Sequence, residues 1–147
     1  MTRLPGSVLF ACNYNSIRSP MAAALLRRLH SRRIFVDSVG IRGLPIDPFV
    51  VAVMEEMGID LASHRPKSFE ELEDGSFDLV VSLTPQAQHR AVELTRSMAC
   101  EVEFWPTHEP GAVEGNRAEI LAAYRALRDD LWRRIRERFP PGITGQV

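Results

Sequence analysis

The sequence lacks the long apolar run of a membrane-spanning helix and is poor in cysteine. None of its hydrophobic stretches approaches the roughly 20 residues that cross a bilayer. Its first residues lead straight into a predicted strand, without the apolar core of a signal peptide. Two cysteines, Cys12 and Cys100, do not make a disulfide framework. These absences predict a cytoplasmic protein with reduced thiols and no membrane partner.

Neither basic nor acidic residues are in excess. The composition therefore gives no reason to expect nucleic acid as a partner. The 18 basic and 19 acidic residues leave a formal net charge of -1. A length of 147 residues fits one domain, here predicted over residues 1–147, and a monomer that at most dimerises weakly. Pro140-Pro141-Gly142 is expected to end the last helix and leave about 140–147 as a loose tail.

Strand and helix patterns alternate along the chain. Strands are predicted at 7–12, 34–36, 77–83 and 100–105, and helices at 20–30, 47–58, 84–97 and 116–138. This alternation predicts an α/β fold, a single doubly wound domain whose four-stranded parallel sheet has helices on both faces. Ligands of such sheets bind beyond the carboxyl ends of the strands. Cys12 and the loop 106–116 both follow strands and are expected at that edge.

The most informative segment is the link between the first strand and the first helix. A Cys-x5-Arg spacing alone is weak, but here Ser19 and Pro20 follow Arg18 and a helix opens. The N–H groups of the link would then converge on one anion with the positive end of the helix dipole. The predicted phosphate-binding residues are Asn13, Tyr14, Asn15, Ser16, Ile17 and Arg18.

A cysteine and an arginine in such a loop suit the transfer of a tetrahedral oxyanion. The field of the loop favours the nucleophilic thiolate of Cys12. The planar guanidinium of Arg18 can bind two oxygens of the transferred group. The Ser19 hydroxyl can donate to the sulfur and ease its departure from a phosphocysteine. The alternative is a buried structural cysteine beside a surface arginine.

Phosphate transfer also needs an acid for the leaving oxygen and a base for the attacking water. Glu109 precedes Pro110 in the loop after the last predicted strand and can serve in both half-reactions. A solvated loop glutamate is the alternative interpretation. His108 is a second candidate donor, with a surface histidine as its alternative.

These segments resemble the low-molecular-weight protein tyrosine phosphatase family, which includes the thioredoxin-coupled arsenate reductases. The resemblance spans nearly the whole chain and is strongest around the cysteine. It implies Cys12 as nucleophile, Arg18 as the transition-state clamp, Ser19 as thiolate partner, and no metal or other cofactor. It also implies that Asn15, Ser38 and His64 brace the loop. The matching segments are 8–12, 18–22, Asp37-Ser38, Asp47-Pro48, 58–61, 63–65 and Phe77-Asp78.

The chain departs from the family's pattern at four positions. Tyr14 stands where the family usually has glycine, and at positive φ it would cost of order 1 kcal/mol or more. Ile17 replaces a second loop cysteine that can trap the oxidised nucleophile. Glu109 replaces an aspartate, and Thr84 stands where the phosphatases often carry another aspartate.

Three functions stay open. The first is a phosphomonoester hydrolase acting on a phosphorylated protein or a small phosphate. The second is a small-thiol-coupled arsenate reductase using glutathione or mycothiol, because residues 82–89 lack the two cysteines of the thioredoxin-coupled branch. The third is a phosphate-binding module with weak catalysis, which Tyr14 and Glu109 motivate. Loops 39–45 and 111–113 contain no aromatic residue, so we expect a shallow site with Tyr14 at its edge.

Overall fold

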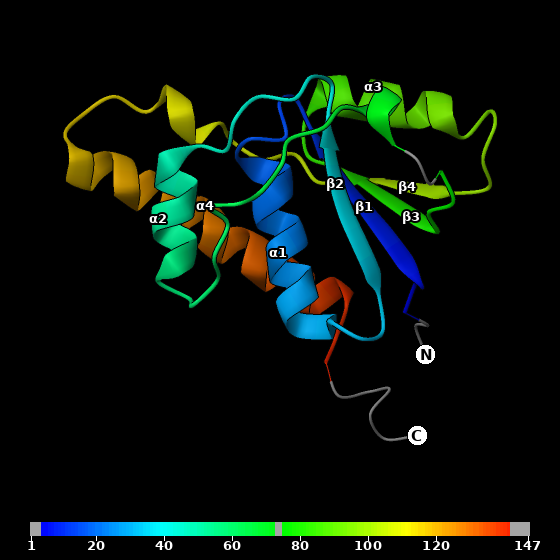
Figure 1. The fold of residues 1–147 in the computed structure, drawn as a ribbon, viewed down its shortest axis with the longest axis horizontal. Coiled ribbons are helices and arrows are strands. Elements are labelled where there is room, and N and C mark those ends of the chain that lie inside the picture. Colours follow the sequence, from blue (N-terminus) through cyan, green and yellow to red (C-terminus); the bar gives the residue numbers. More distant parts are fainter. Residues whose placement is uncertain (1–3, 73–74, 142–147) are drawn as a thin grey trace.

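A computed structural model describes residues 4–72 and 75–141, and in this part of the chain the predicted alternation of strands and helices is confirmed (Figure 1). The strands are β1 (Ser7–Cys12), β2 (Phe35–Gly40), β3 (Leu79–Ser82) and β4 (Glu101–Phe104). The helices are α1 (Arg18–His30), α2 (Pro48–Glu55), α3 (Pro85–Leu94) and α4 (Arg117–Arg138). Two short 3-10 turns are η1 (Phe69–Glu71) and η2 (Pro110–Ala112).

The strands form one parallel sheet in the order β2-β1-β3-β4, which confirms the predicted fold class. The order reverses at β1, so this strand has a parallel neighbour on each side. Its last residue, Cys12, pairs with Gly40 of β2, and Ala11 pairs with Ser82 of β3. The link from β1 to α1 therefore opens at the switch point, where doubly wound sheets bind ligands.

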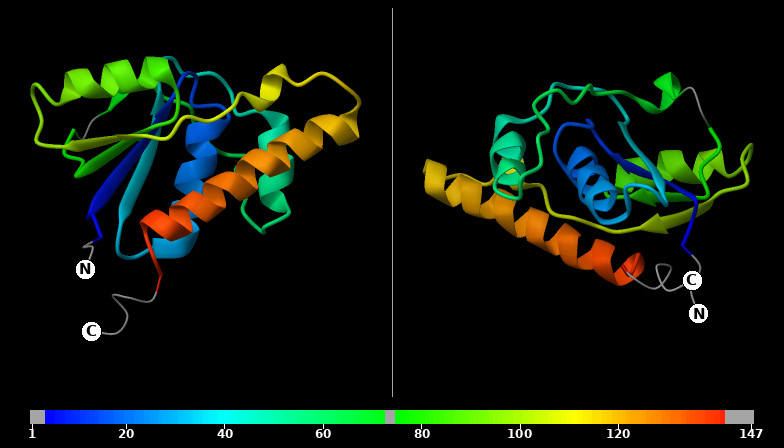
Figure 2. Two further views of the ribbon diagram at one scale, coloured as in Figure 1. Left: turned by 180° about the vertical axis from the view of Figure 1, so that it is seen from behind. Right: turned by 60° about the horizontal axis from the view of Figure 1, so that its bottom comes forward.

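Helices cover both faces of the sheet, α1 and α4 on one and α3 on the other (Figure 2). Alternate residues of β1 face the two layers. Val8 and Phe10 belong to the core under α1 and α4, whereas Leu9 and Ala11 belong to the core under α3, and all four are fully buried. A strand buried on both faces explains the unbroken apolar run before Cys12.

The second strand was predicted wrongly at 34–36, since β2 runs from Phe35 to Gly40. Asp37 and Ser38 are polar and were placed after the strand. In the structure they belong to it, because the Asp37 carboxylate accepts from Lys67 and forms an ion pair with Arg27 at 4.0 Å, and Ser38 bonds to the β1–α1 link. The loop predicted at 39–45 therefore begins only at Ile41, after the end of β2.

The other predicted boundaries shift by one to three residues. α1 begins at Arg18 rather than at Pro20, which lies in its first turn, where a missing N–H leaves no bond unmade. α2 ends at Glu55, and Gly58 with φ 75° closes the following turn. α3 ends at Leu94, and β3 and β4 are each shorter than predicted.

The C-terminal end of α4 packs against the sheet layer. Phe139 is fully buried, and its ring centroid lies 6.3 Å from that of Trp105. Residues 142–147 of the predicted loose tail lie outside the described residues, and a single domain over 1–147 stays a prediction. Among the described helices, none is long and apolar enough to cross a membrane.

Candidate active site

The loop from Cys12 to Arg18 is held from outside by the segment that follows β2. Four of its carbonyl oxygens accept N–H groups from that segment at 3.0–3.1 Å. None of the N–H groups of residues 13–17 donates to an acceptor within residues 4–72 and 75–141. Unpaired donors in a curved backbone favour a bound anion. The four pairs are Ile41 to Cys12, Arg42 to Asn13, Leu44 to Tyr14 and Asp47 to Ser16.

The turn of the loop falls at Asn15, not at Tyr14. Asn15 has φ 53°, and in the described part of the chain no other non-glycine residue has a positive φ. Asparagine tolerates this conformation better than most residues, so Tyr14 carries none of the expected strain. The glycine that the turn needs is Gly40, since a Cβ there would lie 2.6 Å from the Asn15 nitrogen and 2.7 Å from the Tyr14 carbonyl carbon.

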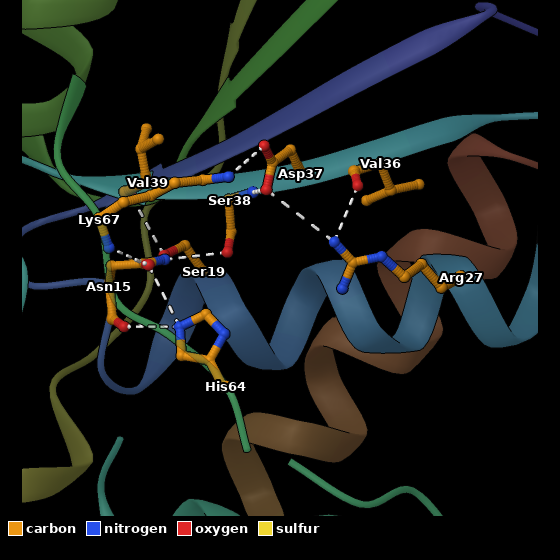
Figure 3. A network of polar contacts seen from close by, with 9 residues as sticks. All are labelled: Asn15, Ser19, Arg27, Val36, Asp37, Ser38, Val39, His64 and Lys67. Atoms are coloured by element: carbon orange, nitrogen blue, oxygen red, sulfur yellow. Dashed lines mark hydrogen bonds and ion pairs between the residues drawn. The ribbon is translucent and has the colours of Figure 1, made fainter. Parts of the chain in front are cut away.

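The fully buried Asn15 side chain ties the loop to three other segments (Figure 3). Its Nδ2 donates to Ser19 Oγ and to Ser38 Oγ, both at 2.9 Å. Its Oδ1 accepts from the Lys67 amide at 3.0 Å and lies 3.1 Å from His64 Nε2. The structure thus brings together Asn15, Ser38 and His64. It adds the Lys67 backbone, which no side-chain pattern could have indicated.

The surroundings of His64 favour its neutral form. Its Nε2 lies 3.1 Å from both the carbonyl oxygen and Oδ1 of Asn15. Both are acceptors, so Nε2 carries the proton. Burial is the main cause that lowers the pKa of His64, and the charges of Arg27 and Lys67 act in the same direction.

The Cys12 sulfur lies at the floor of the loop, 2% exposed at the level of the residue. It is 3.0 Å from Ser19 Oγ and accepts from the Ser19 amide at 3.4 Å. The Ser19 hydroxyl also donates to the Val39 carbonyl at 3.1 Å and accepts from Asn15. Its single proton therefore has two acceptors, and a negatively charged sulfur would favour the bond to Cys12.

Arg18 is buried and links the loop to the segment after β4. Its Nη1 donates to the Thr107 carbonyl at 3.2 Å, and its Nη2 pairs with Glu109 Oε2 at 3.2 Å. The other carboxylate oxygen accepts the Gly111 amide at 2.9 Å. Glu109 is exposed but is held by these two contacts, whereas His108 is exposed and has no polar partner among the described residues.

Thr84, which stands where the phosphatases often carry an aspartate, makes two structural hydrogen bonds. Its Oγ1 accepts the Ala87 amide at 3.1 Å and so caps α3. The same oxygen donates to Asn13 Oδ1 at 2.8 Å and fixes the first residue of the loop. The Thr-Pro pair indicated the start of the helix, but the contact with Asn13 joins residues 71 positions apart and left no signal in the sequence.

Exposed apolar side chains come from three segments at this edge of the sheet. Tyr14 is 44% exposed, Leu44 is 39% exposed and Val113, just after η2, is 37% exposed. The Leu44 amide donates a hydrogen bond to the Tyr14 carbonyl at 3.0 Å.

Among the described residues, no three His, Cys, Asp or Glu side chains are grouped so as to hold a metal ion.

Cys100 lies at the amino-terminal ends of the parallel strands, whereas Cys12 lies at their carboxyl ends. Cys100 precedes Glu101, which is in register with Leu79 and, through it, with Val8. Cys12 is four residues further along β1. At ~3.3 Å per residue the two cysteines are about 15 Å apart along the strands alone. A disulfide needs Cα atoms within about 7 Å, so this fold cannot join them.

Three curated proteins illustrate what the chain is similar to. An arsenate reductase of Halalkalibacterium halodurans is 30% identical over 129 residues, 88% of this chain and 91% of that protein. A protein-arginine-phosphatase of Geobacillus stearothermophilus is 27% identical over 87% of this chain and 90% of its own. A glutaredoxin arsenate reductase of Synechocystis sp. is 36% identical over 76 residues, which are 52% of this chain and 58% of that protein.

The fold agrees with solved structures of the same kind. A mutant of YwlE from Bacillus subtilis superposes with a TM-score of 0.74 over 90% of this chain and 95% of its own, at 24% identity. A sequence model of the low molecular weight phosphotyrosine protein phosphatase family matches residues 7–139 of this chain. The resemblance found in the sequence is therefore confirmed, and the chain belongs to the low molecular weight phosphotyrosine protein phosphatase family.

Proposed function

We propose that this protein is a phosphomonoester hydrolase that forms a phosphocysteine on Cys12. In the first step the thiolate attacks phosphorus, Arg18 binds two of the non-bridging oxygens, and Glu109 gives its proton to the leaving oxygen. In the second step the Glu109 carboxylate takes a proton from water, which attacks the phosphocysteine and releases inorganic phosphate. Ser19 donates to the departing sulfur.

The observation that carries this proposal is the grouping of four functions around one loop. The Cys12 sulfur lies 3.0 Å from the Ser19 hydroxyl, and the N–H groups of 13–17 lack acceptors in the described residues. Arg18 reaches Glu109 at 3.2 Å, so the anion clamp and the acid share one rim. A phosphoryl group bound by the loop would therefore meet nucleophile, clamp and acid together.

Hydrolysis of 4-nitrophenyl phosphate tests the proposal with three variants, two of which have a matched control. Cys12→Ser is expected to lose more than 1000-fold in kcat, whereas Cys100→Ser keeps the wild-type rate. Arg18→Lys keeps the charge but loses the planar fork, and we expect a fall of about 100-fold. Glu109→Gln should lower kcat roughly 10²–10⁴-fold, because hydrolysis of the phosphocysteine also needs Glu109 as general base, and Glu114→Gln should lower it little. Equal rates for wild type and Cys12→Ser would end the proposal.

Arsenate reduction with a small thiol is the second candidate. Relatives named arsenate reductase and glutaredoxin arsenate reductase support it. Reduction to arsenite takes two electrons, which two thiols supply as they join in a disulfide, while one arsenate oxygen leaves as water. Because Cys12 and Cys100 lie on opposite edges of the sheet, glutathione or mycothiol would have to supply the second thiol.

The second candidate predicts arsenate-dependent consumption of reduced glutathione or mycothiol that Cys12→Ser abolishes. No turnover with either thiol, with or without glutaredoxin, would eliminate it. If neither reaction proceeds while phosphate or vanadate raises Tm, the third hypothesis of a phosphate-binding module with weak catalysis holds. Robust phosphatase turnover that falls in Glu109→Gln would exclude that module.

A further inference from the structure

A polar pair beside the loop, the buried Tyr124 and the half-buried Asp47, has no part in the chemistry proposed above. Tyr124 of α4 is 2% exposed, and its hydroxyl donates to Asp47 Oδ2 at 2.8 Å. The ring packs against Phe49, with centroids 5.3 Å apart, which fixes its orientation. Two elements distant in sequence are therefore joined by one polar contact inside an apolar layer.

Asp47 extends this contact to the anion loop. Its Oδ1 accepts the Phe49 amide at 2.7 Å and caps α2. Its own N–H donates to the Ser16 carbonyl at 3.1 Å, one of the bonds that hold the loop from outside. A shift of the Asp47 carboxylate would therefore shift the backbone amide that donates to the Ser16 carbonyl.

Tyr124 also lies near the segment that carries Glu109, because α4 and η2 are neighbours. A Cβ added to Gly111 would lie 3.6 Å from the Tyr124 oxygen, 3.7 Å from Ile17 Cδ1 and 3.1 Å from Glu109 Oε1. Gly111 is the residue whose amide holds Glu109 Oε1 at 2.9 Å. The hydroxyl thus lies close to the turn that orients the carboxylate.

The Tyr124 hydroxyl stays protonated at any working pH. Burial raises its pKa well above that of a free tyrosine, and the neighbouring carboxylates of Asp47 and Glu109 add to the effect. It therefore acts as a fixed donor to Asp47 rather than as a proton carrier.

We propose that Tyr124 is a positioning residue, which sets the Glu109 carboxyl against the anion loop through Asp47 on one side and the Gly111 turn on the other. This inference rests on the proposed function, because it assigns to Glu109 the proton transfer to the leaving group. It predicts that loss of the hydroxyl harms proton transfer more than anion binding.

The test compares two substrates in the full-length protein carrying Tyr124→Phe, which keeps the ring and removes only the hydroxyl. Phenolate is a poor leaving group, so phenyl phosphate needs the proton from Glu109. 4-Nitrophenolate is a better leaving group and departs more readily without that proton. We expect kcat/KM to fall about tenfold with phenyl phosphate and less than threefold with 4-nitrophenyl phosphate. Equal factors for both substrates, including no change, would overturn the inference.

Two further variants separate positioning from a general loss of packing. Asp47→Asn keeps an oxygen that can cap α2 but loses the charge that fixes the tyrosine proton, and it should show the same dependence on the leaving group. Glu56→Gln weakens a different joint between α2 and α4, the ion pairs of Glu56 with Arg125 and Arg128 at 2.8 Å. It should leave both rates unchanged, and a matching leaving-group effect in Glu56→Gln would contradict the inference.

A second readout does not depend on turnover. If wild type shows no Cys12-dependent hydrolysis, the proposed function fails, and hydrogen exchange of residues 107–113 then decides the inference. Tyr124→Phe should speed this exchange about tenfold relative to wild type and Glu56→Gln. Unchanged exchange in Tyr124→Phe would overturn the positioning role on its own.

Discussion

At the scale of single residues, the shape of the anion loop depends on Asn15 more than on the cysteine it surrounds. Its side chain is fully buried, and its hydrogen bonds reach Ser19, Ser38, His64 and Lys67. Its backbone is also in the left-handed region. The residue thus occupies a turn that few side chains tolerate and hydrogen-bonds four polar groups from other segments.

Replacing Asn15 by alanine should cost about 3 kcal/mol of unfolding free energy, because several buried partners lose their bonds and alanine enters positive φ. This corresponds to a fall in Tm of roughly 10 °C. The matched control is Asn116→Ala, which removes the cap of α4 and should cost about 1 kcal/mol. Thermal unfolding measures both, and a loss no larger than that of Asn116→Ala would refute this account of the loop.

His64 gives stability a pH dependence at the same site. Its folded pKa lies below the ordinary value of 6.5, so the unfolded chain binds a proton more readily than the folded protein does. The resulting stabilisation is fully present above pH ~6.5 and is lost as pH falls through the lowered folded pKa. His64→Gln should therefore flatten the fall in unfolding free energy between pH 7.5 and 5.

Urea unfolding across that pH range measures the effect. His108→Gln, a change at an exposed histidine, serves as the control and should follow the wild-type curve. Parallel curves for wild type and His64→Gln would show that this histidine does not titrate differently on folding.

At the scale of elements, the site depends on how closely β2 approaches the β1–α1 link. Gly40 ends β2 beside Cys12, and a Cβ there would lie 2.5 Å from the Arg42 carbonyl oxygen and 2.6 Å from the Asn15 nitrogen. Both contacts are with backbone, which cannot move aside as a flexible side chain would. The strand end therefore needs glycine for its lack of a side chain.

Gly40→Ala should push the two loops apart, lower stability by about 3 kcal/mol and weaken vanadate binding at least tenfold. Gly6→Ala is the control, since its Cβ meets only the Asp78 carboxylate at 3.1 Å. Thermal unfolding and vanadate inhibition measure both variants. Wild-type affinity for vanadate in Gly40→Ala would show that the loop does not depend on this approach.

Local patterns were sufficient to predict the sheet, its helices and the link after β1. The first strand, the helix start at Asp47 and the final helix were predicted from local sequence patterns alone. Contacts between distant segments were not, which is why Lys67 and the Thr84–Asn13 bond were missed. The end of β2 was misplaced because polar residues of an edge strand look like a loop when their partners are unknown.

At the scale of the whole molecule, the parallel sheet separates the two thiols. Every strand ends at the edge that carries Cys12, while Cys100 precedes a strand and lies at the other edge. Burial raises the pKa of the Cys100 thiol and keeps it in its less reactive form. The fold leaves one thiol for chemistry at the site.

Oxidation should therefore yield no Cys12–Cys100 disulfide within one chain. With diamide and glutathione, intact-mass and peptide analysis should find glutathione joined to Cys12 in a mixed disulfide. Cys100→Ser should behave as wild type, and Cys12→Ser should lose the adduct. An internal Cys12–Cys100 link in a folded monomer would contradict the topology described above.

The central claim is that the Cys12 sulfur forms a covalent bond to phosphorus during turnover. Rapid quenching of the enzyme with saturating 4-nitrophenyl phosphate, followed by peptide mass analysis, tests it most directly. Wild type should carry a phosphoryl group on Cys12, and no peptide of Cys12→Ser should carry one. Phosphate on another residue, or turnover of Cys12→Ser at the wild-type rate, would contradict it.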